Sequence, residues 1–312
     1  MPRLLRLLPV LLTLVALATP GYAQDLDAAI EDGNLEELLK PGPWEVETFV
    51  TSLYLPDAQA TSGAGEVDTV INRLRFKFGK NMGMGGFLTL ETAYENRVYT
   101  LRGLDNVPPE AGVPTAAFHG IGFRVRYLQA VSTEWAGFLF GRVRCEYEAG
   151  IRPTEGLSWA VSPGVGHRFK NGLNLGLGVA FVGRIHEGLL IIPGPQFSWR
   201  INERWSTELL GTEFLLTHHF SGRWQLAFAA GFDSPRTRLD DTGPGSLGIF
   251  TDSRLPLQLR ARWTPLDCMS IEARVGVDVY REFFFYDRYG NFLHGERLDP
   301  SPHFGLRLNV RF

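Results

Sequence analysis

The chain alternates apolar and polar residues at every second position over most of its length, and residues 303–312 show the pattern most clearly. The residues at even positions of this segment are apolar: Phe304, Leu306, Leu308, Val310 and Phe312. Those at odd positions, the other parity, are mostly polar or charged: His303, Gly305, Arg307, Asn309 and Arg311. Successive side chains of a β-strand point to opposite faces. The pattern therefore predicts a terminal strand with one apolar and one charged face.

The same alternation recurs in segments bounded by Gly, Asn, Ser, Asp and Pro, which are the residues of turns. We expect fourteen strands, at residues 44–55, 67–78, 85–101, 115–131, 135–149, 157–169, 173–185, 190–201, 204–211, 212–220, 223–235, 253–264, 268–287 and 302–312. Short turns alternate with longer links between them. The count depends on the boundary between Gly211 and Thr212, because a single strand over residues 204–220 would reduce it to thirteen strands. Dropping 44–55 as well would leave twelve, the alternative count.

Residues 1–23 predict export. Arg3 and Arg6 precede an apolar run over residues 7–18, and small residues precede an expected cut near Ala23. This is the pattern of a secretory signal peptide that is removed from the mature protein. The alternative, a membrane anchor, needs about 20 apolar residues, which is more than this run contains.

Composition narrows the function classes further. The mean hydropathy is −0.06 and no later segment is a long uninterrupted apolar run. Lipid offers no partner for backbone polar groups, so strands of this kind cross a membrane only as a closed barrel. The formal net charge is −3, so the chain lacks the excess of positive charge that binds nucleic acid, and we expect no nucleic-acid partner. The seven His are scattered and no Gly-rich phosphate loop occurs, so we expect no metal and no cofactor. Cys145 and Cys268 fall near opposite ends of the expected wall, too far apart for a disulfide.

An exported chain whose final strand ends on a C-terminal Phe resembles the bacterial outer-membrane β-barrels of porin and transporter type. The resemblance covers residues 44–312 and implies an all-β fold: a transmembrane, antiparallel, up-and-down β-barrel with short periplasmic turns and longer outer loops. It also implies localisation in the bacterial outer membrane, with outer-membrane lipid and the barrel-assembly machinery as partners. The assembly signal would be Phe304, Leu306, Leu308, Val310 and Phe312.

Aromatic residues agree with this orientation. Five tryptophans flank the expected short turns, where a periplasmic interfacial girdle belongs: Trp135, Trp199, Trp205, Trp224 and Trp263. Tyrosines stand toward the long links instead: Tyr54, Tyr94, Tyr147 and Tyr280.

The charged parity decides which face of the barrel is inside. An Arg or Lys that faces lipid at mid-depth costs about 2–4 kcal/mol, so the charged face must enclose the lumen. The lumen-lining residues predicted in this way are Arg73, Arg75, Glu91, Arg124, Arg126, Arg142, Arg144, Glu146, Arg168, Arg200, Arg260, Arg262, Glu272, Arg274, Asp278, Arg307 and Arg311. In residues 268–287 the same alternation also assigns Tyr280 and Glu282 to the lumen.

Two segments depart from a uniform wall. Residues 24–43 are acidic and predict a periplasmic leader with a short helix, either a plug for the Arg-rich lumen or a solvated leader. Pro193 and Pro195, followed by two short strands, predict a low stretch of rim between Ile191 and Thr212. This rim is either a lateral opening for an apolar solute or an irregularity. No long link stands out as an inward-folding constriction.

Three functions remain. The resemblance favours a channel or transporter for small solutes through an Arg/Glu-lined lumen, selective by charge. The alternatives are a structural or adhesive barrel with a filled lumen, and an outer-membrane lipid hydrolase that uses His219 and Ser221. We expect the protein not to be an enzyme, because Ser221 falls in an expected periplasmic turn. The sequence leaves the solute, the gate and the oligomeric state open.

Overall fold

The computed structural model describes residues 41–63, 65–103, 115–239 and 248–312. The expected signal peptide and most of the acidic leader, including its short helix, lie outside the described residues. The described part is almost entirely β-strand. Its elements are β1 (Pro41–Gln59), β2 (Glu66–Gly83), β3 (Gly86–Arg102), β4 (Thr115–Ala130), β5 (Trp135–Glu148), a 3₁₀ helix (Pro153–Gly156), β6 (Leu157–Arg168), β7 (Leu173–Gly183), β8 (Leu190–Arg200), β9 (Trp205–Leu210), β10 (Glu213–Ser221), β11 (Trp224–Gly231), β12 (Arg236–Arg238), β13 (Ile249–Leu266), β14 (Met269–Tyr286), β15 (Phe292–Leu298) and β16 (Ser301–Arg311).

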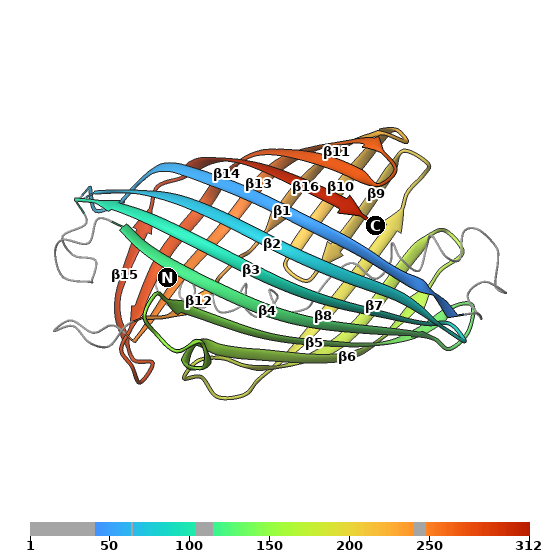
Figure 1. Cartoon of the computed structure of the whole chain (residues 1–312), viewed down its shortest axis with the longest axis horizontal. Helices are drawn as coiled ribbons and strands as arrows, with labels where there is room; N and C mark the ends of the chain where they lie inside the picture. The colour runs from blue at the N-terminus through green and yellow to red at the C-terminus, as the bar shows by residue number, and fades with distance from the viewer. Residues whose placement is uncertain (1–40, 64, 104–114, 240–247) are drawn as a thin grey trace, which may run out of the picture.

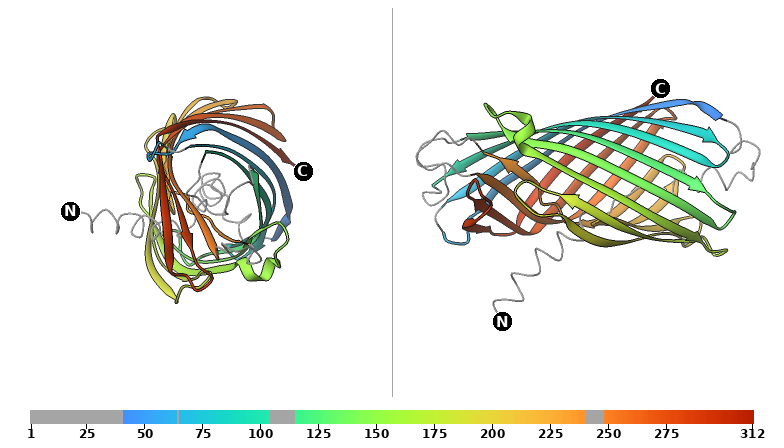
Figure 2. Two further views of the ribbon diagram at one scale, coloured as in Figure 1. Left: turned by 90° about the vertical axis from the view of Figure 1, so that its left-hand side faces the viewer. Right: turned by 90° about the horizontal axis from the view of Figure 1, so that it is seen from below.

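Fourteen of these strands close into a ring (Figures 1 and 2). Strands β1 to β11 follow one another in chain order, β11 pairs with β13, β13 with β14, β14 with β16, and β16 returns to β1. All of these pairings are antiparallel. The two remaining strands are extensions, because β12 pairs with β13 beyond the end of β11, and β15 pairs with β14 beyond the end of β16. The predicted antiparallel barrel of fourteen strands is confirmed, and the alternative of twelve is wrong.

The turn between β9 and β10 decides this count. Gly211 has φ of 67°, in the left-handed region that glycine adopts without a steric penalty. Leu210 and Glu213 face each other directly across this turn. Residues 204–220 therefore form a tight hairpin instead of one long strand.

The outer surface of the barrel is apolar. Leu177, Leu259 and Leu306 each expose half or more of their surface. Exposed tryptophans stand beside the short turns: Trp135, Trp199, Trp205, Trp224 and Trp263. An apolar band of this extent is unfavourable in water and matches lipid hydrocarbon. The band and its aromatic girdle are those of a transmembrane β-barrel of the outer-membrane type. Among the described residues, no helix is long and apolar enough to cross a membrane.

A β-bulge in β14 exchanges the two faces of its outer half. Val279 has no partner in β13, because its neighbours Asp278 and Tyr280 pair with consecutive residues of that strand. One extra residue inverts the side-chain alternation beyond it. The assignment of Tyr280 and Glu282 to the lumen is therefore wrong. The buried positions beyond the bulge are Arg281, Phe283 and Phe285.

The described part of the link after β11, residues 232–239 with β12, crosses the outer end of the barrel and is called the closing segment below. β12 pairs with β13 on one side and forms a parallel bridge from Arg238 to Tyr147 of β5 on the other. Because β5 and β13 are not neighbours in the ring, this segment crosses the interior. The expectation that no link folds inward is wrong here. Residues of seven strands, of the turn after β1 and of this link pack as an apolar core at the outer end: Ala58, Ala60, Val67, Tyr99, Ala116, Phe118, Leu239, Phe250, Phe283, Phe285 and Leu298.

The wall is low where β9 and β10 stand, as Figure 1 shows. β9 has six residues and pairs with β8 only over residues 197–200 of β8. Among the described residues, the outer half of β8 therefore has no strand on its β9 side. The expected low stretch of rim is present at this position.

Two prolines fit this free edge. The backbone N–H of Arg200 donates to Gly172, toward β7. Successive backbone N–H groups of a strand alternate between its two neighbours. Pro193 and Pro195, at odd positions of an unbroken register, therefore direct their nitrogens to the free edge. No ladder hydrogen bond is lost there, which is the position that proline tolerates in a sheet.

Candidate functional site

A central cavity of about 320 Å³ lies in the lumen beneath the segment that closes the outer end. Its charged lining is mostly basic. The arginines are Arg73, Arg124, Arg142, Arg144, Arg184, Arg236, Arg254, Arg260 and Arg274. The carboxylates are Glu146, Glu213 and Asp233. The cavity also touches Thr212, at the tip of the β9–β10 hairpin, so it extends to the low part of the wall.

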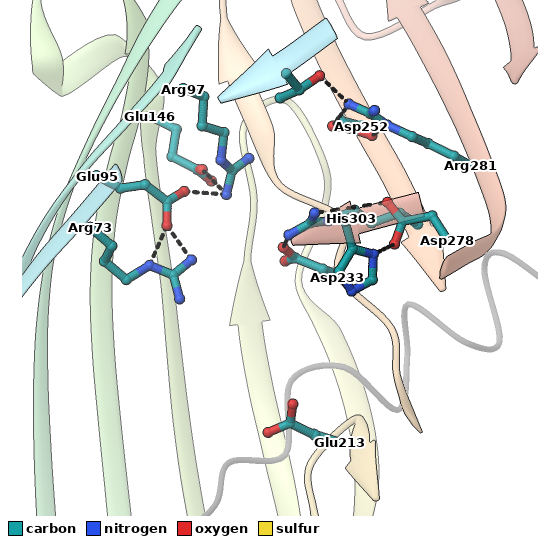
Figure 3. A network of polar contacts seen from close by, with 12 residues as sticks. Arg73, Glu95, Arg97, Glu146, Glu213, Asp233, Asp252, Asp278, Arg281 and His303 are labelled. Carbon is teal, nitrogen blue, oxygen red and sulfur yellow. Dashed lines mark hydrogen bonds and ion pairs between the residues drawn. The ribbon is translucent and has the colours of Figure 1, made fainter. Parts of the chain in front are cut away.

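An ion-pair ladder runs along the β2–β5 side of this cavity, with Glu95 of β3 at its centre (Figure 3). Glu95 pairs with Arg73 of β2 and Arg97 of its own strand, and it accepts a hydrogen bond from Arg144 of β5 at 2.9 Å. Arg144 also pairs with Glu146 at 2.7 Å. Glu95 and Glu146 are buried, so their charges are held by arginines instead of by water.

A second network lies deeper, toward the outer end. Arg281 is fully buried and donates from Nε to Asp252 Oδ1 at 3.0 Å and from Nη2 to Asp252 Oδ2 at 2.9 Å. Arg281 Nη2 also donates to Thr69 Oγ1 at 2.8 Å, and the Tyr99 hydroxyl donates to Asp252 Oδ2 at 2.9 Å. The bidentate pair joins β13 to β14, and the bonds to Thr69 and from Tyr99 connect it to β2 and β3.

The closing segment is fastened to the wall by Asp233. Its backbone N–H donates to the carbonyl of Arg254 at 2.9 Å, and the Arg254 N–H returns a bond of 2.8 Å. Arg254 Nη2 donates to the Asp233 carboxylate at 3.1 Å. Asp278, which is fully buried, lies 3.3 Å from His303 Nδ1 and 4.0 Å from Arg254 Nη1. Figure 3 shows these groups beside the Arg281 network.

The periplasmic half of the lumen is also charged. Glu272 pairs with Arg262 at 2.9 Å and with Arg274 at 2.6 Å. Phe49 lies between two arginines, with the guanidinium carbons of Arg75 and Arg307 each 4.4 Å from its ring centroid. These are cation–π contacts on a ring that is itself buried.

The sequence-predicted lumen residues all have inward parity in their strands. The cavity brings together Arg73, Arg124, Arg142, Arg144, Glu146, Arg260 and Arg274. Around or below it lie Arg75, Glu91, Arg126, Arg168, Arg200, Arg262, Glu272, Arg307 and Arg311, and Asp278 lies with the deeper network. Their role in solute passage stays a prediction.

Sequence reasoning missed several charged residues of the interior. Glu95 and Arg97 share the parity of Glu91 in β3, so the alternation itself could have identified them. Arg281 was hidden by the bulge. Asp233 falls on the polar parity of the expected strand 223–235, so the alternation could have identified it, although β11 ends at Gly231 and Asp233 lies in the link that follows.

The proposed hydrolase pair is not assembled. His219 Nε2 lies 3.2 Å from the hydroxyl of Ser206. The Ser221 hydroxyl oxygen accepts hydrogen bonds from the backbone N–H groups of Arg223 and Trp224 at 3.3 and 3.2 Å, so it caps the periplasmic turn. A nucleophile needs a base within hydrogen-bond reach, and His219 faces a different serine. Among the described residues, no group of three His, Cys, Asp or Glu side chains is placed to hold a metal ion.

One titratable group at the outer rim departs from ordinary behaviour. Asp287 begins the turn between β14 and β15 and is exposed to water. A hydrogen bond from the side-chain amide of Asn291 at 2.8 Å, followed by backbone N–H donors, holds the pKa of the Asp287 carboxyl below its usual value.

Comparison with known proteins finds one family model that matches part of the chain, and remote structural similarity. Residues 165–311 match the model of a "Domain of unknown function (DUF6268)". No curated protein matches the chain. The COG4313 outer membrane channel from Pseudomonas putida F1 has 8% identity and a TM-score of 0.48, over 87% of this chain and 96% of that one. The translocator domain of autotransporter NalP from Neisseria meningitidis has 11% identity and a TM-score of 0.39, over 93% and 97%.

The Pseudomonas putida toluene transporter TodX has 8% identity and a TM-score of 0.36, over 95% of this chain and 96% of that chain. Similarity at these levels leaves the function to be argued from the residues of this chain.

Proposed function

We propose that the protein is an outer-membrane channel for small solutes. The observation that supports it best is the central cavity, which a wall of charged side chains surrounds and which extends to the tip of the low β9–β10 hairpin. A barrel that served only as a rigid support would gain stability by filling this volume with apolar side chains.

The periplasmic half of the lumen is accessible to water. The side chains of Arg262, toward the periplasmic end, and of Arg73, in the central cavity, are about two-fifths exposed, although they point inward. Arg281, near the outer end, is fully buried and has no contact with solvent. Water therefore reaches the cavity from the periplasmic mouth and stops at the apolar core and the Asp252 network.

The low wall supplies the second opening of the proposed path. Among the described residues, the outer half of β8 has no strand on its β9 side, and β9 with β10 end well below the rim. A solute that passes above Thr212 exchanges between the cavity and the lipid-facing side of the barrel without displacing the core at the outer end.

The function is tested by swelling of liposomes that contain the purified barrel, with sugars of graded size as solutes. We expect uptake of small sugars by the wild-type protein. Thr212→Trp places an indole at the low wall and is expected to slow swelling several-fold. Thr61→Trp, in the exposed turn between β1 and β2, is the matched control and leaves swelling unchanged.

A filled structural barrel is the second candidate, favoured by the apolar core at the outer end. Liposomes that stay impermeable to every sugar, down to the smallest, would support that function and contradict the channel. Equal swelling by wild type and Thr212→Trp would keep a channel but remove the lateral path.

A further inference from the structure

Two arginines face each other directly across neighbouring strands in the central cavity. Arg124 of β4 pairs in register with Arg142 of β5, and both line the cavity. Like charges at directly opposed positions of a sheet destabilise it. Such a pair therefore calls for an anion that neutralises it, either from the chain or from a ligand.

The opposite side of the cavity shows how the chain neutralises a pair of this kind. Arg260 of β13 and Arg274 of β14 are also directly opposed. Each has a carboxylate within ion-pair distance, because Arg260 pairs with Glu213 and Arg274 pairs with Glu272, which Arg262 also contacts.

The Arg124–Arg142 pair is not neutralised in this way. Arg124 shares Glu91, which accepts its hydrogen bond at 3.0 Å, with Arg75 at 3.6 Å. Among the residues that the structure describes, Arg142 has no carboxylate within ion-pair distance, and its buried Nε has no hydrogen-bond partner. Arg142 is half-buried, and burying its Nε–H donor without an acceptor is unfavourable. The cavity thus keeps an unsatisfied cationic group on its β4–β5 wall.

The cavity also has an apolar lining. Val182 and Ile185, from β7 and the link after it, and Phe232, from the start of the closing segment, line the same volume. A ligand that satisfies both parts carries a negative charge at one end and an apolar body at the other. The volume of about 320 Å³ lies at the lower end of the range of small-molecule sites, about 300–1,000 Å³.

We propose that the Arg124–Arg142 pair is a binding subsite for the carboxylate of a small organic anion whose apolar body packs toward Val182, Ile185 and Phe232. The proposal deepens the channel function, since it assigns the solute class of the same cavity. Guanidinium groups bind carboxylates through paired, charge-assisted hydrogen bonds, and Arg142 has donors without partners for that purpose.

The test is isothermal titration calorimetry of the detergent-purified, full mature chain at pH 7 with three probes of similar size and different charge: benzoate, benzyl alcohol and benzylammonium. We expect benzoate to bind at least about tenfold more tightly than the other two, because one charge-assisted hydrogen bond is worth that factor. Arg142→Gln and Arg124→Gln should each weaken benzoate by about tenfold or more, and Arg142→Lys should restore part of the loss. Arg102→Gln, which removes the same charge at the exposed outer rim, is the control and should leave binding unchanged.

Benzoate that binds the wild-type protein no more tightly than benzyl alcohol overturns the proposal, and this comparison needs no variant to fold. Equal benzoate binding by wild type and Arg142→Gln also overturns it. A barrel that binds benzoate but admits no solute into liposomes keeps the subsite and refutes the channel. A barrel that lets solutes into liposomes but binds benzoate no more tightly than the other probes keeps the channel and refutes the subsite.

Discussion

Removing the carboxylate of Asp252 should destabilise the barrel strongly, because it leaves the Arg281 guanidinium buried without a counter-charge. Arg281 is fully buried and Asp252 nearly so, and the two are joined by hydrogen bonds of 3.0 and 2.9 Å. Loss of one partner from a buried pair costs about 3–5 kcal/mol. Asp252→Ala also removes the acceptor of the Tyr99 hydroxyl, an unmade bond worth about 1–3 kcal/mol more. We therefore expect Asp252→Ala to lower the free energy of unfolding by at least about 3 kcal/mol.

The double variant Asp252→Leu, Arg281→Met separates the charge from the packing. It removes both charges and keeps apolar volume, and such replacements of buried pairs are often neutral. We expect it to recover most of the stability lost by Asp252→Ala. The control is Arg102→Gln, since Arg102 pairs with Glu66 at the exposed rim, where a pair contributes about 0–1 kcal/mol.

The assay is urea unfolding of the barrel in lipid vesicles, followed by tryptophan fluorescence, with the free energy extrapolated to zero denaturant. A loss below about 1 kcal/mol for Asp252→Ala would refute the buried pair as a structural element of the outer end. A double variant as unstable as Asp252→Ala would show that packing, and not charge, accounts for the loss.

Three further outcomes follow. If the acidic leader acts as a plug, deleting residues 24–42 raises single-channel conductance in planar bilayers, and unchanged conductance would reject the plug. Leu259→Arg puts a charge on the lipid face and should cost about 2–4 kcal/mol in the same unfolding assay, whereas Arg260→Leu, on the inner face, should leave insertion intact; equal defects would contradict the assigned faces. The lowered pKa of Asp287 means that its ionised form stabilises the outer turn above the unfolded carboxyl pKa of about 3.9, and this contribution disappears as the pH falls through the lower folded value. Amide exchange of residues 287–291, corrected for intrinsic rates, should therefore accelerate in acid, and identical protection at pH 6 and pH 2.5 would argue against the Asn291 bond.

Most of the barrel could be predicted from sequence because alternation is a local property. In β13 the charged positions Arg260 and Arg262 and the apolar positions Leu259 and Trp263 fall on the two faces that the pattern assigned. The division of β9 from β10 was also readable, because Gly211 supplies the turn conformation.

The rest depended on interactions that alternation does not encode. The bulge at Val279 inverts the faces of the β14 residues beyond it, and only the pairing with β13 reveals it. The closing segment is held by Asp233, whose partner Arg254 lies in another strand. That no carboxylate of the described residues lies within ion-pair distance of Arg142 depends on side-chain positions, whereas the sequence shows only that charges of both signs occur on one face.

The central claim is that charged side chains face an enclosed, water-filled interior while apolar side chains face lipid. The most direct test uses two single-cysteine variants, Leu306→Cys and Arg307→Cys, in a chain whose native Cys145 and Cys268 are replaced by Ser. A water-soluble maleimide is applied to the reconstituted barrel. The account predicts rapid labelling at position 307 and protection at position 306, where only a lipid-soluble reagent reacts. Equal labelling of the two positions by the water-soluble reagent would contradict it.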